Sequence, residues 1–543
     1  MSSKRRQRIA VATFSTALAV TGLSRLVAGY CPNIQGPFRT KTPSIWLNPN
    51  IDDVICPASG CPNFTSVLRT STAVWTEIAE DAASQLRPVY QEPGPGAPRD
   101  PGATIPGFIH VYGVATCEDA ASSGESADDD GDGKTDWGKI KICAKLGAQT
   151  IEWGFPTISS FPILYYQGVL AHEFGHVLGF QHNSECGQSL TSVMSLTTND
   201  AQYGTHLFFD DIQGYRALYG HSNSTFRAYE TTDGLTWTPG NSLVIDEGTR
   251  PMTRVSACNS LGAASWTSYP VSPSFASAVL DTKYLPGSWT GPFNSVFGSS
   301  SYPTGIACGS GTSMFISWMQ LSASHSTEAL PVSSASTADG GAHWTAPVTE
   351  TATGTGDGGP TRAGGTGAAF DPVTGLYAMV WRSNRNAVVL KVKAPNSPIQ
   401  TFTGSDSILI RSGDTPAISC GPSSVGTENC VIVWDHVDWN QTIKWAHGHI
   451  QAGSPPRFVM SSVVSQGIVS YGSPSVAYRG GSSPWTLAVH QGGNTVFTFR
   501  KGNGTTAAWA DQRSVSSGNL ITSPGVGAAQ AIGKGYLFFT SSN

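Results

Sequence analysis

The stretch His172-Glu173-Phe174-Gly175-His176-Val177-Leu178-Gly179-Phe180-Gln181-His182 decides the fold and the chemistry of the first half of this chain. Residues four apart lie on one face of a helix, so His172 and His176 can hold the same metal ion. Gly179 allows the left-handed turn that ends a helix, and the chain beyond it can return His182 as a third nitrogen ligand. Three neutral imidazoles with one position left for water are typical of a catalytic zinc site rather than a structural one.

Glu173 follows the first of these histidines directly, where its carboxylate can reach a water molecule at the metal. A carboxylate in that place is suited to act as a general base. The alternative is a helix with surface histidines, which the short pattern HExxH would leave open. The complete run HExxHxxGxxH disfavours it.

Two further segments agree with this motif. Met194 follows His182 by twelve positions, and the segment 210–220 reads DDIQGYRALYG. With these motifs the sequence resembles the metzincin clan of zinc endopeptidases, and within it a matrixin, over about residues 40–220. The resemblance implies that the three histidines bind zinc and that the glutamate is catalytic. It also implies a turn in which Met194 packs beneath the histidines as a soft apolar floor.

Two positions depart from other members of the clan. Asn183 follows the third histidine, where many matrixins have serine and astacins have glutamate. Leu196 stands where astacins and serralysins place a tyrosine that serves as an extra ligand, so we expect no tyrosine ligand. No cysteine-switch motif is found, and latency through a pro-segment thiol is not supported.

Residues 1–29 have the composition of a secretory signal peptide. A mostly apolar run spans residues 9–23, and small residues suited to cleavage stand at 27–29. The basic residues before the run are Lys4, Arg5, Arg6 and Arg8. We therefore expect a secreted protein. No other run is long and apolar enough to span a membrane.

The charge balance argues against nucleic acid as a partner. The chain has 32 Lys and Arg against 37 Asp and Glu, and five of the basic residues lie in the signal segment. The remainder therefore carries a net charge near −10. Such a surface repels a polyphosphate backbone.

All ten cysteines follow the signal segment, an even number that suits an oxidising compartment. Cys56 and Cys61 are close enough for a small loop, and Cys420 and Cys430 can close a hairpin. The pairing of the other six stays open. No CxxC pair occurs, so we expect no structural zinc-thiolate site.

An acidic loop at residues 128–136 reads DDDGDGKTD and fits the pattern DxDxDGxxD. Oxygens at alternate positions suit calcium, and the pattern assigns it to Asp128, Asp130, Asp132 and Asp136. Position twelve is Lys139, where an EF-hand has a bidentate glutamate, so the loop resembles the shorter calcium loops of extracellular proteins. The alternative is a solvated acidic loop without an ion.

The N-terminal half has the patterns of mixed α and β structure. Apolar residues at helical spacing between Phe64 and Ile78 predict a first long helix, and Phe108–Tyr112 predicts a strand. The helix of the motif is expected at about residues 167–178, and the segment 210–220 predicts another. Many Pro and Gly at residues 91–106 predict a surface loop.

After Gly220 helical periodicity disappears, and short β-rich runs alternate with turns. Prolines recur at intervals of 50 to 58 residues, and each is preceded by an aromatic residue 14 to 16 positions earlier. The prolines are Pro251, Pro303, Pro360, Pro416, Pro474 and Pro524. The aromatic residues are Trp237, Trp289, Trp344, Phe402, Phe458 and Trp509.

One of these units contains residues 337–344, TADGGAHW, and residues 231–237 are a copy one residue shorter. Both resemble the Asp-box of sialidase-like propellers, in which an aspartate stabilises a hairpin turn through its backbone donors. Six units predict a six-bladed β-propeller, with residues 224–246 adding strands to the short last unit and closing the ring. The runner-up fold is a pair of β-sandwich modules.

The sequence thus predicts a multidomain protein. A signal peptide at 1–29 precedes an α+β zinc peptidase domain at 30–220 and an all-β propeller at 221–543. We expect a secreted zinc endopeptidase that hydrolyses peptide bonds of extracellular proteins, with a propeller that binds or positions the substrate. The alternatives are a propeller that binds glycans or a surface, with a subsidiary peptidase, a sialidase-like glycosidase, and a propeller that only supports the peptidase fold.

Overall fold

The structure is a computed structural model. It describes residues 37–39, 43–48, 50–55, 68, 71, 75, 89–91, 103–154, 163–182, 193–194, 215, 218–219, 224–240, 243–245, 254–258, 261–268, 278–285, 288–289, 304–319, 331–350, 365–383, 387–394, 396–402, 410, 415–436, 442–470, 473–491, 495–516, 519–520, 525–529 and 534–542. The predicted signal peptide, the Cys56–Cys61 loop, Asn183 and Leu196 lie outside these residues.

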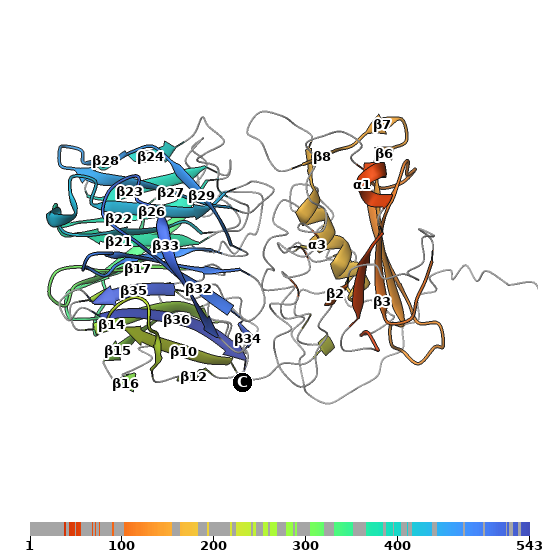
Figure 1. The fold of residues 1–543 in the computed structure, drawn as a ribbon, viewed down its shortest axis with the longest axis horizontal. Coiled ribbons are helices and arrows are strands. Elements are labelled where there is room, and N and C mark those ends of the chain that lie inside the picture. The colour runs from red at the N-terminus through yellow and green to blue at the C-terminus, as the bar shows by residue number, and fades with distance from the viewer. Residues whose placement is uncertain are drawn as a thin grey trace, which may run out of the picture.

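A five-stranded sheet is the frame of the N-terminal part (Figure 1). Its strand order is β2-β1-β3-β5-β4, and all neighbours are parallel except β4, which pairs antiparallel with β5 at the edge. The strands are β1 (Ser44–Leu47), β2 (Val89–Gln91), β3 (Phe108–Val114), β4 (Ser122–Ala127) and β5 (Trp137–Cys143).

The sheet buries one set of alternating side chains. In β5, Ile140 and Ile142 are fully buried while Lys139 and Lys141 alternate with them, as the two-residue period of a strand requires. The buried set packs in one cluster with α3 (Tyr166–Val177), and α1 (Asn50–Ile55) contacts β3. The predicted strand at Phe108–Tyr112 and the predicted helix of the motif are therefore confirmed as β3 and α3.

Other predicted helices are described only in part. Leu68, Ser71 and Trp75 are helical and buried, and Tyr215 and Tyr219 are helical and buried in the same core. Four short strands complete the N-terminal part: β6 (Lys145–Leu146) pairs with β7 (Gln149–Thr150), and β8 (Glu152–Gly154) pairs with β9 (Ile163–Tyr165). Among the described residues, none of the helices is long and apolar enough to cross a lipid bilayer.

The C-terminal part is all β and contains a propeller-like ring of five blades, each built from consecutive antiparallel strands (Figure 1). The first three blades are β13 (Arg254–Cys258) to β16 (Ser288–Trp289), β17 (Gly305–Cys308) to β20 (Val348–Thr349), and β21 (Thr366–Asp371) to β24 (Ile399–Phe402). The next two are β25 (Ala417–Cys420) to β29 (Val464–Val469) and β30 (Ser475–Tyr478) to β33 (Trp509–Ser516).

The strands inside these blades are β14 (Leu261–Ser268), β15 (Ala278–Leu285), β18 (Met314–Met319), β19 (Val332–Thr337), β22 (Leu376–Arg382), β23 (Val388–Lys393), β26 (Cys430–Asp435), β27 (Thr442–Gln451), β28 (Arg457–Met460), β31 (Trp485–His490) and β32 (Thr495–Lys501). Some of them are buried along their whole length, as in β18 and β26. Strands covered on both faces are expected to lack polar alternation.

A further sheet joins strands that lie far apart in the sequence. It combines β10 (Ser224–Thr231), β11 (Thr238–Pro239) and β12 (Leu243–Ile245) with β34 (Asn519–Leu520), β35 (Gly525–Ala529) and β36 (Lys534–Ser542). β10 pairs with β36 over eight residue pairs, and β35 contacts both β13 and β30. The predicted count of six blades stays a prediction.

The sequence repeat has a structural counterpart in the blades. Five of the six repeated aromatic residues lie in the outermost strand of their sheet or directly before it, as Trp289 does in β16 and Phe458 in β28, and Trp344 lies four positions before β20. Pro416 and Pro474 directly precede innermost strands of the next blades, β25 and β30. The repeat therefore corresponds to the connection from the outermost strand of one blade to the innermost strand of the next.

Both Asp-box segments form the expected turns. Asp339 accepts a hydrogen bond from the backbone N–H of His343, and Asp233 accepts from those of Leu235 and Thr236. These donors hold the pKa of both carboxyl groups well below its usual range, together with the neighbouring hydroxyls. The side chains thus stabilise hairpin turns rather than line a cleft.

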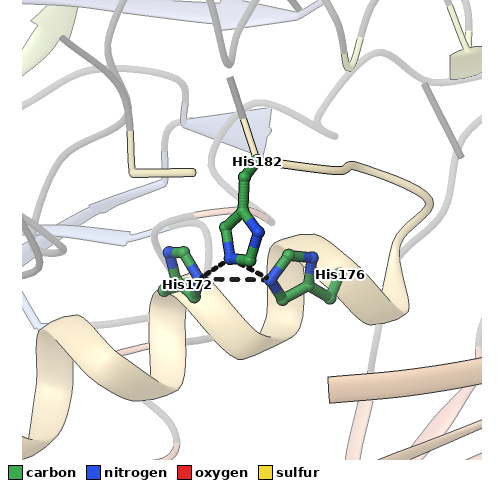
Figure 2. A group of neighbouring side chains, drawn as sticks. All are labelled: His172, His176 and His182. Atoms are coloured by element: carbon green, nitrogen blue, oxygen red, sulfur yellow. Dashed lines mark hydrogen bonds between the residues drawn. The ribbon is translucent and has the colours of Figure 1, made fainter. Parts of the chain in front are cut away.

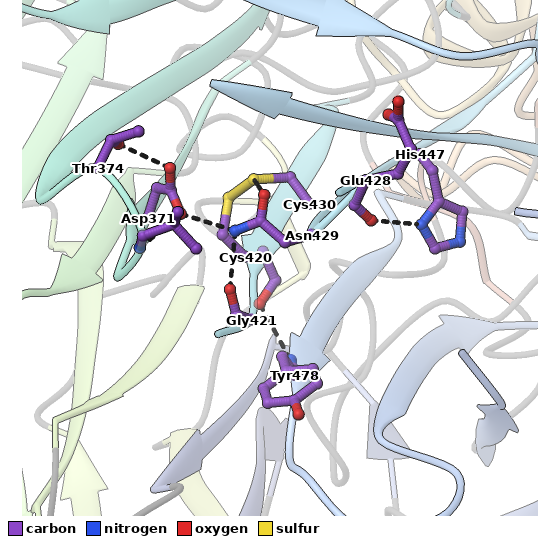
Figure 3. The surroundings of a disulfide bond; sticks show 11 residues. Asp371, Thr374, Cys420, Gly421, Glu428, Asn429, Cys430, His447 and Tyr478 are labelled. Atoms are coloured by element: carbon purple, nitrogen blue, oxygen red, sulfur yellow. Dashed lines mark hydrogen bonds between the residues drawn. A yellow bond between two sulfur atoms is a disulfide. The ribbon is translucent and has the colours of Figure 1, made fainter. Parts of the chain in front are cut away.

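A disulfide joins Cys420 and Cys430 across β25 and β26, which confirms that predicted pair (Figure 3). The adjacent Asn429 amide donates to the carbonyl of Gly421 and to the carboxylate of Asp371 in the neighbouring blade. The hairpin is therefore tied both to itself and to the next blade. A second disulfide, Cys117–Cys143, links the end of β5 to the loop after β3.

A buried charge connects the β25–β29 blade to the β30–β33 blade. Lys501 is 1% exposed, and its ammonium donates to the carbonyls of Gly502 and Gly504. It also lies 2.8 Å from Nε2 of His447 and over the ring of Trp445. An ammonium only donates, so His447 must accept and stay neutral. Burial and the Lys501 charge lower the pKa of His447 to about 4.

This pair predicts a loss of propeller stability in mild acid. The unfolded histidine binds a proton below about pH 6.5, whereas the folded one resists protonation down to about pH 4. The free energy of unfolding should therefore fall by up to about 3 kcal/mol between these values. In urea titrations from pH 7 to pH 4, His447→Gln should show a shallower pH dependence than the wild type. Equal slopes for the two chains would contradict the prediction.

Candidate metal centre

The end of α3 is shaped by Gly179. Its φ of 101° is in the left-handed region, as predicted. The N–H of Gly179 bonds to the carbonyl of His176, and the N–H of Phe180 bonds to that of Gly175. This hydrogen-bond pair is the Schellman motif, which ends a helix and reverses the chain. The reversal returns His182 toward the helix.

The three histidines meet above α3, two from the helix and one from the returning chain (Figure 2). The Nε2 atom of His176 is 3.1 Å from those of His172 and His182, and the latter two are 3.2 Å apart. One point in space is thus within reach of all three nitrogens. The structure brings together the residues that the sequence singles out.

Hydrogen bonds at the far side of two rings define which nitrogen carries the proton. Nδ1 of His172 lies 2.6 Å from the carbonyl of Val193, and Nδ1 of His176 lies 2.8 Å from that of Phe180. A carbonyl only accepts, so each Nδ1 is the protonated atom and each Nε2 presents a lone pair. Burial lowers the pKa of both histidines to about 4, which keeps them neutral near pH 7.

This arrangement fits a bound cation. Lone pairs about 3 Å apart repel each other in a buried site unless a positive charge lies between them. Three imidazole nitrogens are a donor set that zinc prefers. Carbonyl partners on the outer nitrogens are the usual support of metal-binding histidines.

Glu173 lies on α3 beside the histidines and is 5% exposed. Its Oε1 accepts a 2.6 Å hydrogen bond from the Ser122 hydroxyl, and its carboxylate also accepts from the backbone N–H of Gly124. Burial raises its pKa above the ordinary value, while the nearby histidines and these donors oppose the rise. A base with a raised pKa is better matched to neutral pH.

Two glycines let other segments approach α3. A side-chain atom on Gly175 would collide with the sulfur of Met194 and meet the ring of Trp75. One on Gly124 would collide with the carbonyl of Glu173. Met194 is 1% exposed and lies against α3 at Gly175, and its role as a floor beneath the histidines stays a prediction. Trp75 donates to the carbonyl of Ala171 and stacks on Phe180.

In the acidic loop, the structure brings together three of the four aspartates that the sequence assigns to calcium. Carboxylate oxygens of Asp128, Asp130 and Asp136 lie within 4.8 Å of one another, and Asp132 is not in this group. Arg39 makes ion pairs with Asp130, Asp132 and Asp136 at 2.6, 3.1 and 2.8 Å. The hydrogen bond from Arg39 lowers the pKa of Asp130. The positive charge of the Arg39 guanidinium thus balances part of the negative charge of the loop.

The propeller has a groove of about 900 Å³ between the β21–β24 and β25–β29 sheets. Its polar lining comes from Thr374, Asn396, His449, Gln451 and Ser454. Apolar lining includes Val373, which is 52% exposed. The turn of Thr374 is fixed by hydrogen bonds to Asp371, which Asn429 holds in turn. One wall of the groove is therefore preformed.

Sequence reasoning missed several residues of these sites. Ser122 and Gly124 lie about fifty positions before Glu173, in a strand whose sequence SSGESA has no apolar alternation. Arg39 lies about ninety positions before the acidic loop. No local pattern links such distant partners, so only the fold brings them together.

Comparison with known proteins gives one family. The matrixin family model matches residues 149–220, which include α3 and the three histidines.

The solved structures to which the chain is similar are distant. The SapL1 lectin in complex with alpha methyl fucoside is 15% identical, with 52% of this chain and 85% of the lectin covered and a TM-score of 0.34. A mutant Aleuria aurantia lectin in complex with alpha-methyl-L-fucoside is 12% identical, with 52% and 84% covered and a TM-score of 0.35. A Penicillium chrysogenum alpha-L-arabinanase complexed with arabinobiose is 13% identical, with 59% and 98% covered and a TM-score of 0.35.

The contact between Gly175 and Met194 predicts an unusual response to alanine. In most helix interiors Gly→Ala is stabilising by roughly 0.5–1 kcal/mol. Gly175→Ala should instead lower the free energy of unfolding by about 1–3 kcal/mol, because the new methyl group overpacks against the sulfur. Urea denaturation of the full chain measures this change. Gly502→Ala, where a methyl group meets no atom within 4 Å, is the control, and an unchanged or more stable Gly175→Ala would contradict the packing described.

Proposed function

We propose that this chain is a secreted zinc endopeptidase that hydrolyses peptide bonds of extracellular proteins. The observation that carries the proposal is the convergence of three imidazole Nε2 atoms beside a buried carboxylate. His172, His176 and His182 would hold the zinc ion. Glu173 would be the catalytic residue, and Met194 supports the site from below. The match of residues 149–220 to the matrixin family supports this assignment.

Zinc bound there would act as a Lewis acid that polarises the scissile carbonyl and makes water more acidic. The chain's own residues perform the remaining tasks. Glu173 accepts a proton from the attacking water and later delivers it to the leaving amine, so that one C–N bond is replaced by one C–O bond. The carbonyls of Val193 and Phe180 keep two of the histidines in the tautomer that presents Nε2.

We propose the domain boundaries that the sequence suggests, with a signal peptide at 1–29, the peptidase at 30–220 and a propeller at 221–543. Six blades are supported by the contacts of the innermost strands. β13, β17, β21, β25 and β30 contact one another in sequence, and β35 contacts both β30 and β13. The sheet of β10–β12 and β34–β36 would then be the sixth blade, and the ring would have no open edge.

We also propose that the acidic loop binds calcium. The proximity of three carboxylates supports this proposal, since calcium prefers oxygen ligands. The Arg39 guanidinium contacts the same carboxylates, so calcium and Arg39 would compete for them. The carboxylates of Asp128, Asp130 and Asp136 would be ligands, and Asp132 would join them only after leaving Arg39.

The groove favours a second function for the propeller, the binding of a ligand. Its polar lining consists of amide, hydroxyl and imidazole groups without Lys, Arg, Asp or Glu, which suits a neutral, hydroxyl-rich or amide-rich ligand. β24 and β28, which border it, lie at the side of the propeller away from α3 (Figure 1). We propose that this groove binds a glycan or a surface protein and thereby positions the peptidase on a large substrate.

The assignment of the active site predicts different outcomes for its two kinds of residue. Glu173→Ala should keep zinc and the fold but lose about 10²–10⁴-fold in rate, because the base is gone. His182→Ala should lose zinc. Cleavage of labelled casein and metal analysis measure these effects. Near wild-type proteolysis by Glu173→Ala, or full zinc content in His182→Ala, would contradict the assigned roles.

Competition at the acidic loop predicts that calcium raises the melting temperature of metal-stripped protein, because the ion binds only the folded loop. Arg39→Gln should lower the melting temperature without calcium and give a larger rise with millimolar calcium. Calorimetry measures both shifts. A midpoint that does not move with calcium in either chain would exclude the loop as a calcium site.

The groove predicts a substrate-size effect. His449→Ala combined with Gln451→Ala should leave the cleavage of short peptides unchanged and lower the rate on an insoluble protein substrate several-fold, because only the large substrate is tethered. Arg513→Ala, on the outer strand β33, is the control. Equal loss on both substrates would mean that the propeller supports the peptidase fold instead.

A further inference from the structure

We propose that Ser122 is a positioning residue that orients the Glu173 carboxylate toward the three-histidine site. This inference rests on the proposed function and extends it to a residue that lies outside the HExxHxxGxxH motif. Ser122 is the first residue of β4, the strand at the sheet edge next to α3.

The contact has the geometry of a strong hydrogen bond. The Ser122 hydroxyl lies 2.6 Å from Oε1 of Glu173, within the range for a hydroxyl that donates to a carboxylate. The backbone N–H of Gly124 donates to the same carboxylate. Two donors from one strand therefore restrain a side chain that has three rotatable bonds of its own.

The strand that carries these donors is itself fixed. β4 pairs with β5 along its whole length, with Ser122 opposite Ile142 and Gly124 opposite Ile140. Gly124 has no side-chain atom between the strand and the helix, so the backbone of β4 lies directly against the carbonyl of Glu173. The position of the Ser122 hydroxyl is thus set by the sheet and not by a loop, which is the kind of support a precise site requires.

The bond leaves the carboxylate able to act as a base. Ser122 donates to one lone pair of Oε1, and the carboxylate keeps other lone pairs that can take the proton from water and return it to the leaving amine. No proton is gained or lost by Ser122 in this sequence, since its hydroxyl only donates. Its contribution is orientation, and orientation of a base acts on the chemical step more than on substrate binding.

Ser123 offers a matched control. It is the next residue of the same strand, and its hydroxyl is buried without a hydrogen-bond partner in the part of the chain that the structure describes. Removing either hydroxyl changes the strand by the same single atom. Only Ser122→Ala removes a bond to Glu173.

The test uses the full chain loaded with zinc and a quenched fluorescent peptide selected with the wild type. Ser122→Ala should lower kcat about tenfold, the loss of one hydrogen bond to a charged group, with KM within twofold of wild type. Zinc content and melting temperature should be unchanged. Ser122→Thr, which keeps the hydroxyl and suits a strand, should recover kcat to within about threefold, and Ser123→Ala should match the wild type.

Three results would overturn the inference: a wild-type kcat in Ser122→Ala, equal losses in Ser122→Ala and Ser123→Ala, or a change confined to KM. Failure of the proposed function looks different, because the wild type would then not cleave the peptide or Glu173→Ala would cleave it as fast. If Ser122→Thr does not fold, Ser122→Cys replaces it. That variant keeps a weaker donor and should give a kcat between those of Ser122→Ala and the wild type.

Discussion

The close approach of two segments to α3 is the constraint on which the candidate site depends. The edge strand β4 lies against the helix at Gly124, and the turn at Met194 lies against it at Gly175. Each approach leaves no room for a single extra carbon atom. Because of them, the helix presents Glu173 to donors from the strand and His172 to the carbonyl of Val193. The residues around the site therefore have one arrangement, set by packing, before any metal ion or substrate enters it.

Burial by this packing also sets the protonation of the residues in the site. The protein removes water from two histidines and one carboxylate, which keeps the histidines neutral and makes the carboxylate a stronger base. In the acidic loop the opposite condition holds, because Arg39 and several carboxylates share an exposed surface where solvent screens them. Glu173 and the acidic loop thus differ in chemistry because they differ in burial, although the sequence motifs pointed to both.

What the sequence could predict is the part of the structure that depends on local spacing. The motif predicts the helix, its end at Gly179 and the meeting of the three histidines. All of these depend on residues that lie within eleven positions of one another in the sequence. The repeat of proline and aromatic residues likewise records the blades, and the ten-residue separation of Cys420 and Cys430 allowed their pairing to be predicted. Ser122, Arg39 and the Asn429–Asp371 contact were not predictable, because each joins segments that only tertiary structure brings together.

The sheet that joins β10 to β36 has a consequence for the order of events during synthesis. Glu230 and Lys534 form an ion pair across 304 residues, and the strands that carry them are neighbours. A ribosome must therefore produce almost the whole chain before β10 can pair with β36, while the N-terminal part was synthesised hundreds of residues earlier. Met319, at the end of β18, is buried in the same cluster as α3 and the N-terminal sheet, so this contact between the two parts also forms only after β18 has been synthesised. The sheet that joins the two ends of the C-terminal part is thus the last to form, long after the strands and helix of the N-terminal part have left the ribosome.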